Sequence, residues 1–391
     1  MTAGASVRVV ARVLALDHAG VLGGAELSML DVIAGLASDV AVRLFADGSF
    51  REELERRGVD VQVLAMGALG AVKKGGGLPP LGALRAAWTL AGRVAREGRT
   101  SRLLYANSQK AFVVAALAGL RCRRPVIWHL RDLLGPPHFS ALNTRAVVTL
   151  ANWGAARVIA NSRATAEAFV AHGGRRAKVR VVHNGIDTAP FDAVVDADAR
   201  ARREQLSSGA GYVMAVFGRL HEWKGQHTAI AAMRALPSDV HLWIVGAPLF
   251  GEQAFEQGLR IQAAQLGLGS RVHFLGFRDD VAALMRAADV VVHTSTLPEP
   301  FGRVIVEGML SRRPVIATAA GGVGEILSDG RTGVLVPPGN AAAIAAAVRA
   351  LRDDPLRAAA IAAAGAEHAR ATFGVDAMVR GVQAVFDEVT G

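Results

Sequence analysis

The sequence predicts an α/β protein made of two doubly wound parallel sheets that face a cleft. Short β-branched apolar runs alternate with amphipathic helical patterns along the chain, which is typical of parallel sheets covered on both faces. The 391 residues favour two to three domains at roughly 150 residues each. With 51% apolar and 20% charged residues, the composition excludes general disorder.

In the first half, short runs rich in Val, Ile and Leu predict buried strands. These strands are expected at 7–16, 40–45, 61–64, 102–106, 125–129, 157–160 and 179–182. The stretches between them repeat apolar residues at helical spacing. They predict helices at 26–37, 81–97, 108–119 and 162–172.

The second half repeats the alternation. Strands are expected at 212–217, 241–245, 272–274, 290–293, 315–318 and 333–336. Helices are expected at 226–235, 253–266, 281–287 and 302–310. The alanine-rich stretches 340–352 and 358–366 also predict helices, because alanine has the highest helix propensity.

A polar segment rich in Ala, Asp and Arg separates the two patterns. It predicts an N-terminal domain over 1–187, a linker over 188–209 and a C-terminal domain over 210–370. The helix expected near 375–390, within the final segment 371–391, stands apart from the second pattern. Ligands of such sheets bind at the carboxyl ends of strands, so the loops after strands should carry the chemistry.

The positive charge is uneven. The chain has 44 Lys and Arg against 34 Asp and Glu, a net charge of +10. Residues 1–188 contain 25 Lys and Arg but 13 Asp and Glu, whereas the remainder contains 19 Lys and Arg and 21 Asp and Glu. A basic half suggests contact with nucleic acid, a phosphorylated substrate or a membrane surface. With 5% aromatic residues and no recognition motif, nucleic acid is disfavoured.

The basic clusters are Lys73-Lys74, Arg121-Arg123-Arg124 and the group Arg175, Arg176, Lys178 and Arg180. They could dock on anionic lipid headgroups, or equally be solvated faces. Cys122 is the single cysteine, which excludes an intramolecular disulfide. No apolar run reaches about 18 residues, and no signal-peptide block opens the sequence, so we expect a cytoplasmic protein without a spanning helix.

The loop after strand 290–293 carries two acids. Glu299 lies in the loop, and Glu307 follows eight residues later on a helix of apolar residues. A carboxylate there is costly to bury unless something polar, such as a ribose or sugar diol, meets it. The amides of Phe301, Gly302 and Arg303 at the helix start can bind a phosphate or a sugar hydroxyl. The alternative is a capped helix with one solvated Glu.

Other strand ends carry weaker signals. Arg219 and Lys224 lie five apart in a short loop, a pairing that suits a diphosphate, although a solvated loop would look the same. His129 ends strand 125–129 at the mouth of the first domain and is either structural or catalytic. Gly23 and Gly24 open a helix and would let the backbone approach an anion.

One further loop completes the pattern. Gly321-Gly322 and Glu325 lie in a turn that should pack beside the Glu299 loop. There is no Walker phosphate loop, no nucleophile elbow and no zinc spacing. The Asp196-x-Asp198 pair falls in the polar linker, and we interpret it as solvated rather than metal-binding.

Together these motifs resemble the retaining glycosyltransferases of family 4, which have the GT-B fold. The motifs are GGAE at 23–26, WH at 128–129, GRL and KG within 218–225, EPFG with a following Glu at 299–307, and GGVGE at 321–325. The resemblance covers nearly the whole chain. It implies two Rossmann-like domains, a nucleotide-sugar donor in the second and an acceptor mainly on the first, with the final helix crossing back onto the first domain.

The resemblance also implies residue roles. Arg219 and Lys224 would bind the donor diphosphate, and Glu307 the ribose. Glu299 would contact the transferred sugar, with the amides of 301–303 on sugar hydroxyls or phosphate. Gly23 and Gly24 would approach the donor phosphate or the acceptor, and His129 would lie beside the reacting sugar. The loop 276–281, with Phe277, would lie by the base.

The implied reaction needs no metal or other cofactor. The two cations neutralise the leaving diphosphate, whose oxygen takes the acceptor proton on the same face and retains the anomeric configuration. We expect the donor to be a UDP- or GDP-sugar. The basic clusters of the first half suggest a lipid-linked or cell-envelope glycan as the acceptor, with peripheral attachment to an anionic membrane. One alternative is a transferase that acts on a soluble natural product or a small sugar. The other is a sugar-nucleotide epimerase. A pyridoxal phosphorylase is disfavoured because Lys224 is the only lysine in the second half.

Overall fold

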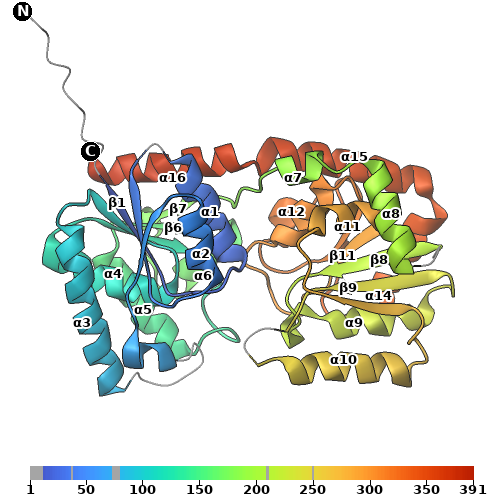
Figure 1. Ribbon diagram of the computed structural model, residues 1–391, viewed down its shortest axis with the longest axis horizontal. Helices are drawn as coiled ribbons and strands as arrows, with labels where there is room; N and C mark the ends of the chain where they lie inside the picture. Colours follow the sequence, from blue (N-terminus) through green and yellow to red (C-terminus); the bar gives the residue numbers. More distant parts are fainter. Residues whose placement is uncertain (1–11, 37, 73–79, 208–210, 249–250) are drawn as a thin grey trace, which may run out of the picture. The chain divides into compact units, whose positions relative to one another are not determined.

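The computed structural model describes residues 12–36, 38–72, 80–207, 211–248 and 251–391. It divides into two compact units, each built on one parallel sheet (Figure 1). Unit 1 is 1–185 together with 375–391, and unit 2 is 186–374. The predicted α/β class with two parallel sheets is confirmed.

The sheet of unit 1 is parallel throughout its described strands. From edge to edge it runs β3 (Asp60–Val63), β2 (Val40–Leu44), β1 (Val13–Asp17), β4 (Leu103–Ala106), β5 (Val126–Leu130), β6 (Arg157–Ala160) and β7 (Val179–Val181). The order reverses between β1 and β4, where parallel α/β sheets form their binding crevice.

Helices cover both faces of this sheet. One core contains side chains from α1 (Gly24–Gly35), α2 (Ser49–Arg56) and α16 (Val375–Thr390). The other contains side chains from the 3₁₀ turn η1 (Gly67–Ala71), α3 (Leu81–Gly98), α4 (Gln109–Cys122), α5 (Ala141–Gly154) and α6 (Arg163–Ala171). Ser108, Ser140 and Ser162 cap α4, α5 and α6 by accepting a backbone N–H, which fixes where these helices begin. A 3₁₀ turn η2 (Arg176–Lys178) leads into β7.

Helix α16 lies along one face of unit 1. Near its start the Met378 sulfur accepts hydrogen bonds from Ser28 and from the Gly185 amide, and near its end Glu388 accepts from Arg157 and Arg180. Its packing on α1 is close, since a Cβ on Gly35 would lie 2.5 Å from Val379.

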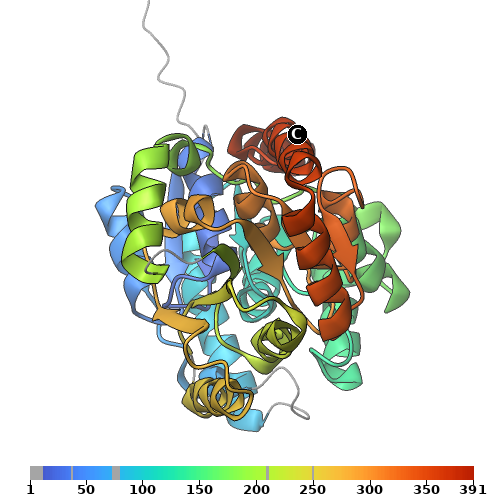
Figure 2. The ribbon, with the colours of Figure 1, turned by 90° about the vertical axis from the view of Figure 1, so that its right-hand side faces the viewer.

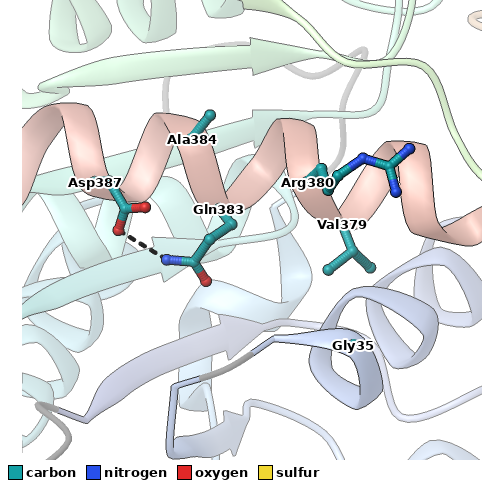
Figure 3. Close-up of a pocket in the computed structure, with 6 residues that line it drawn as sticks. All are labelled: Gly35, Val379, Arg380, Gln383, Ala384 and Asp387. Carbon is teal, nitrogen blue, oxygen red and sulfur yellow. Dashed lines mark hydrogen bonds between the residues drawn. The ribbon is translucent and has the colours of Figure 1, made fainter.

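A shallow groove of about 330 Å³ lies between α1 and α16 (Figure 3). Gln383 donates to Asp387 in this groove, and Asp387 also accepts from Arg102, directly before β4. The Asp387 end therefore lies by the amino ends of the strands, opposite the edge where ligands of such sheets bind.

The sheet of unit 2 is also parallel and reverses in the same way, between β8 and β11. It runs β10 (Val272–Gly276), β9 (Val240–Val245), β8 (Tyr212–Phe217), β11 (Val290–His293), β12 (Val315–Thr318) and β13 (Val334–Val336). One core lies under α9 (Gln226–Ala232), α10 (Gln253–Gln265) and α14 (Ala341–Asp353). The other lies under α8 (Asp196–Ser207), α11 (Val281–Ala287), α12 (Arg303–Leu310), α13 (Val323–Ile326) and α15 (Pro355–Thr372).

The remaining elements of unit 2 are short. They are α7 (Ala189–Asp192), η3 (Glu222–Lys224) and η4 (Met233–Ala235). Figure 2 shows unit 2 from its own side, with its helices arranged around the sheet.

Several segments differ from their sequence-based description. The polar segment expected as a linker contains α7 and α8, and Ala199 of α8 is buried in a core that it shares with α11. Asp196 is exposed, as expected, and pairs with Arg286. Helices α2 and α5 were not predicted. Residues 1–11 and the Lys73-Lys74 pair lie outside the described part of the chain. In that described part, no helix is both long and apolar enough to span a bilayer.

Candidate functional site

A cluster of hydrogen-bonded polar and charged side chains lies in unit 2, where the loops after β8 and β11 meet at the reversal of strand order. The Lys224 ammonium donates to Oε1 of Glu299 at 2.5 Å. Two further groups converge on this oxygen: Ser295 donates to it at 2.7 Å, and the Nε2 atom of His293 lies 3.1 Å away. Within the described chain Oε2 of Glu299 has no hydrogen-bond partner, so one oxygen is held in place while the other is available to a ligand.

A second layer of contacts orients these groups. Thr318 at the end of β12 donates to the Ser295 carbonyl at 2.8 Å, and its hydroxyl lies 3.3 Å from Nδ1 of His293. The Glu299 carbonyl accepts from the Gly322 amide at 2.8 Å. The expected packing of the 321–325 turn beside the Glu299 loop is thereby confirmed.

Glu299 is buried and ionised. Burial alone would raise the pKa of this carboxyl, but the Lys224 charge together with the hydrogen bond and charge of His293 outweighs burial and holds the pKa of Glu299 well below its usual range. A buried carboxylate of this kind carries a fixed negative charge at neutral pH.

Glycine is required where the two loops touch. Gly225 has a φ of +72°, and a Cβ there would lie 2.0 Å from the Thr294 carbonyl oxygen. The contact is held by the Thr294 hydroxyl, which donates to the Lys224 carbonyl, and by the Thr296 amide, which donates to the Trp223 carbonyl. This close approach keeps Lys224 within reach of Glu299.

Helix α12 begins at Arg303, close to the helix start that the sequence predicts near Gly302. Gly302 has a φ of +111° and directly precedes the first helical residue. The Phe301 side chain is buried against Phe373, so its ring is not exposed to a ligand. Arg303 Nε lies 3.5 Å from an oxygen of Glu307, one turn later, which gives that acid a cation close by.

Arg219 follows β8 and Phe277 follows β10, two strands that lie on either side of β9 and end at the same edge of the sheet. Burial lowers the pKa of the Arg219 guanidinium, and the charges of Glu252 and Glu299 partly oppose this effect, so Arg219 lies in the electrostatic field of the same carboxylate. Gln226, which is buried, donates to the Arg219 carbonyl at 2.9 Å. Phe277 follows β10 with its ring 82% exposed, an unusual placement for phenylalanine.

Unit 1 has a buried polar network at its own reversal point, where β1, β4 and β5 end. Asn107 donates to Asp17 at 2.6 Å, and Arg131 Nε donates to Asn107 at 2.9 Å. Arg131 also donates to Ser28 and to Asn184. Asp17, Asn107 and Arg131 each lie at or directly after a strand end, the position where sequence reasoning could have found them.

Gly23 and Gly24 precede and begin α1, as expected. The Gly23 amide donates to Oε2 of Glu26 at 3.0 Å, the reciprocal half of a capping box. Burial, and then the nearby Asp17 charge, raise the pKa of Glu26 to about 7. Glu26 thus serves as a helix cap, as its position in the first turn suggests, but its pKa lies close to neutral pH.

His129 lies deeper than expected. Its side chain is fully buried and not open at the mouth of the domain, the position that its place at the strand end predicts. Its Nδ1 lies 2.5 Å from the Tyr105 hydroxyl, and Nε2 has no partner within the described residues. Burial, with a smaller contribution from the Arg131 charge, lowers the pKa of His129 well below its usual value. Alternation along β5 places His129 on the same face as Ile127, which is buried in the core that contains α1 and α16, so His129 is enclosed beneath these helices. Arg131 follows beyond the last residue of β5.

The structure therefore groups Arg219, Lys224 and Glu299 in unit 2, and Asp17, Glu26 and Arg131 in unit 1. His293 and Ser295 were missed, although both lie at the end of β11. Across the described residues, no three His, Cys, Asp or Glu side chains gather closely enough to hold a metal ion.

Comparison with known proteins places this geometry in a family. Residues 198–368 match the model described as "Glycosyl transferases group 1", and residues 23–185 match "Glycosyl transferase 4-like domain". The crystal structure of Anabaena Alr3699/HepE in complex with UDP and glucose is 39% identical, with a TM-score of 0.89. That match covers 96% of this chain and 99% of the Anabaena chain.

Two curated relatives match in part. The D-inositol 3-phosphate glycosyltransferase of Streptomyces avermitilis is 34% identical over 233 residues, 56% of this chain and 49% of its own length. The lipopolysaccharide core biosynthesis glycosyltransferase LpsE of Rhizobium meliloti is 34% identical over 201 residues, 51% and 55% of the two chains. The matched regions thus span about half the length of these relatives. With both units matched, the chain belongs to the group 1 glycosyltransferases and is a glycosyltransferase of the GT-B fold.

Proposed function

We propose that this enzyme moves a sugar from a nucleotide diphosphate sugar to an acceptor hydroxyl with retention of the anomeric configuration. The observation that carries the proposal is the Lys224–Glu299 pair, a partly exposed ammonium on a buried carboxylate with one oxygen unoccupied. Phosphate oxygens and sugar hydroxyls are the complementary ligands of these two groups.

Each donor group would have a partner in unit 2. Lys224 and Arg219 would neutralise the diphosphate, most strongly as charge develops on it during bond cleavage. Oε2 of Glu299 would accept a hydroxyl of the transferred sugar, with the amides of 301–303 beside it. Glu307 would hold the ribose diol, and the exposed Phe277 ring would stack on the base.

Donor phosphate itself would complete the chemistry. The bond from the anomeric carbon to the diphosphate oxygen would break, and this oxygen would take the proton of the acceptor hydroxyl while the acceptor oxygen bonds to the same face of the sugar, so no side-chain base or metal would be needed. The Anabaena protein is solved with UDP, with UDP and glucose, and with UDP-glucose, which makes UDP-glucose the first donor to test here.

The acceptor would bind mainly on unit 1, near the glycines of α1 and the buried network at the strand ends. For His129, whose side chain is enclosed, we propose an indirect role through Tyr105 and a positioning effect on the Arg131 region. A lipid-linked or cell-envelope glycan is the proposed acceptor class, with peripheral association on an anionic membrane.

Binding and product analysis together test the proposal. UDP, GDP, ADP and TDP are compared by thermal shift, and the best nucleotide's glucose conjugate is then followed by proton NMR. A ligand that binds only the folded state raises the unfolding temperature. Release of sugar with its original anomeric configuration supports the proposal, whereas an inverted product refutes retention. Acceptor-independent conversion to an epimeric sugar nucleotide would instead identify an epimerase.

A further inference from the structure

The net positive charge of the whole chain is confined to one segment. Residues 81–157 contain twelve Lys and Arg but two Asp and Glu, a net charge of +10 that equals the net charge of the full sequence. The remaining residues hold 32 basic and 32 acidic side chains. This segment contains α3, α4 and α5, which pack in that order on one face of the unit 1 sheet (Figure 1).

Most of these cations lie on the solvent side of the three helices, here called the outer face. Arg85, Arg93, Arg96 and Arg99 are exposed on or just after α3, and Arg145 on α5. Glu97, one of the two acids, is paired with the buried Arg43 at 2.6 Å. The outer face therefore has little negative charge to balance its arginines.

The same face exposes large apolar side chains. They are Leu81, Leu84 and Trp88 on α3, Leu120 on α4, and Leu142 and Trp153 on α5, with exposed fractions of 46% to 77%. Positions 81, 84 and 88 repeat at helical spacing and form one stripe. Exposed Trp and Leu in such numbers on one face favour an interaction surface over ordinary scatter.

Direct contacts join the apolar and basic groups across the helices. The Arg121 guanidinium carbon of α4 lies 3.4 Å from the centre of the Trp88 ring, and Arg121 donates to the Trp88 carbonyl. On the other side of α4, Ala116 lies against Gly154, next to Trp153, and Leu120 follows Ala116 by one helical turn. The three helices that carry the outer face therefore pack side by side in the order α3, α4, α5.

We propose that the outer face docks on an anionic lipid bilayer. Tryptophan and arginine side chains suit the boundary between headgroups and acyl chains, because each has an apolar body and a polar end. Arginine adds attraction to acidic headgroups, worth about fivefold in partitioning per charge. A nucleic acid would use the arginines but would leave four leucines in water, so the mixed composition favours a membrane.

The test is vesicle sedimentation of the 391-residue protein. Vesicles of phosphatidylcholine alone are compared with vesicles containing about 30 mol% phosphatidylglycerol, at low and high salt. We expect binding to the acidic vesicles at low salt. Arg85→Glu with Arg145→Glu should weaken this binding by about thirtyfold or more. Trp153→Ser should weaken it even at low salt, because the ring and not only the charge contributes.

Matched controls lie in unit 2. Arg234→Glu with Arg357→Glu makes the same change in net charge at exposed sites, and Leu356→Ser removes a side chain that is 85% exposed. Both should pellet like the parent. Equal losses in the control and outer-face variants would overturn the proposal, as would absence of binding to acidic vesicles, or a Trp153→Ser variant that binds like the parent.

The inference rests on the proposed membrane partner but not on the donor. UDP binding is therefore measured on every variant by thermal shift. Loss of vesicle binding with UDP binding retained supports the outer face as the docking surface. Failure of UDP binding in the parent protein would count against the proposed function and leave the vesicle result interpretable. Tighter binding to an oligonucleotide than to acidic vesicles would replace the membrane with nucleic acid and overturn the proposal.

Discussion

Lys224 and Glu299 are 75 positions apart in the sequence, yet the lysine Nζ lies 2.5 Å from the glutamate Oε1. The sheet order brings them together, because β8 and β11 are neighbours in space although β9 and β10 separate them in the chain. The first prediction concerns this pair. Lys224→Met should lower the free energy of unfolding by roughly 3–5 kcal/mol, since it leaves a buried charge without its partner.

The same variant should also weaken nucleotide binding, measured by calorimetric titration with UDP. Arg260→Met is the control, because it breaks an exposed ion pair with Glu256 in the same unit and should cost under about 1 kcal/mol. Adding Glu299→Gln to Lys224→Met should recover part of the lost stability but not the nucleotide affinity. Equal effects of Lys224→Met and Arg260→Met would contradict this assignment.

The second prediction is a pH dependence of Glu299. Its pKa is held well below the usual value, so the folded state binds fewer protons than the unfolded state in acid. The stabilisation is therefore fully present above the ordinary glutamate pKa and is lost as the pH falls toward the folded value. The stability difference between wild type and Glu299→Gln should shrink as the pH is lowered from 7 to about 3. Differential scanning calorimetry measures it; a difference that stays constant would count against the ion pair.

The third prediction has the opposite sign and concerns Glu26, whose pKa is raised to about 7. The folded state then binds more protons between the ordinary glutamate pKa and 7, so stability should fall as the pH rises through this range. Glu26→Gln keeps an acceptor for the Gly23 amide and removes the titration. The unfolding free energy of Glu26→Gln minus that of wild type should therefore increase by up to about 3 kcal/mol as the pH is raised from 5 to 8. If the unfolding temperatures of wild type and Glu26→Gln change with pH in the same way, the raised pKa of Glu26 is refuted.

The fourth prediction is steric. Gly225→Ala must place a Cβ 2.0 Å from the Thr294 carbonyl at a φ of +72°. We expect a loss of at least about 1–3 kcal/mol in stability and reduced sugar transfer, because the Lys224 loop must move. Gly258→Ala in α10 meets nothing within 4 Å and should stabilise by about 0.5–1 kcal/mol. Thermal unfolding and initial rates compare the pair, and a neutral Gly225→Ala would show that the loop contact is dispensable.

The fifth prediction separates binding from stability at Phe277. Because the ring is 82% exposed, Phe277→Ala should leave the unfolding free energy within about 0.5 kcal/mol of the parent. If the ring stacks on the base, nucleotide affinity should fall by about 1–3 kcal/mol. Leu356→Ala, also on the surface of unit 2, should change neither quantity. Equal UDP affinities of the Phe277→Ala and Leu356→Ala variants would show that Phe277 does not contact the base.

Local patterns were sufficient for much of this molecule. Strand–helix alternation determined the fold class, and β-branched runs located strands such as β8 and β12 at their observed bounds. Residue type and strand-end position singled out Lys224, Glu299 and the Gly302 helix start, since parallel sheets collect ligand groups at one edge. These features depend on neighbours in sequence, or on a rule shared by parallel α/β sheets.

Tertiary structure decided what depends on distant contacts. The polar segment 196–207 folds as α8 because Ala199 packs with α11, an interaction that no local pattern reveals. Strand alternation and the cover of α16 enclose His129, whereas Arg131, two residues on, joins a network with Asn107 and Asn184. The sequence determined which residues are chemically able to act; only three-dimensional packing decided which are buried, which are paired and which remain open to a ligand, because burial and pairing are properties of residues far apart in the chain.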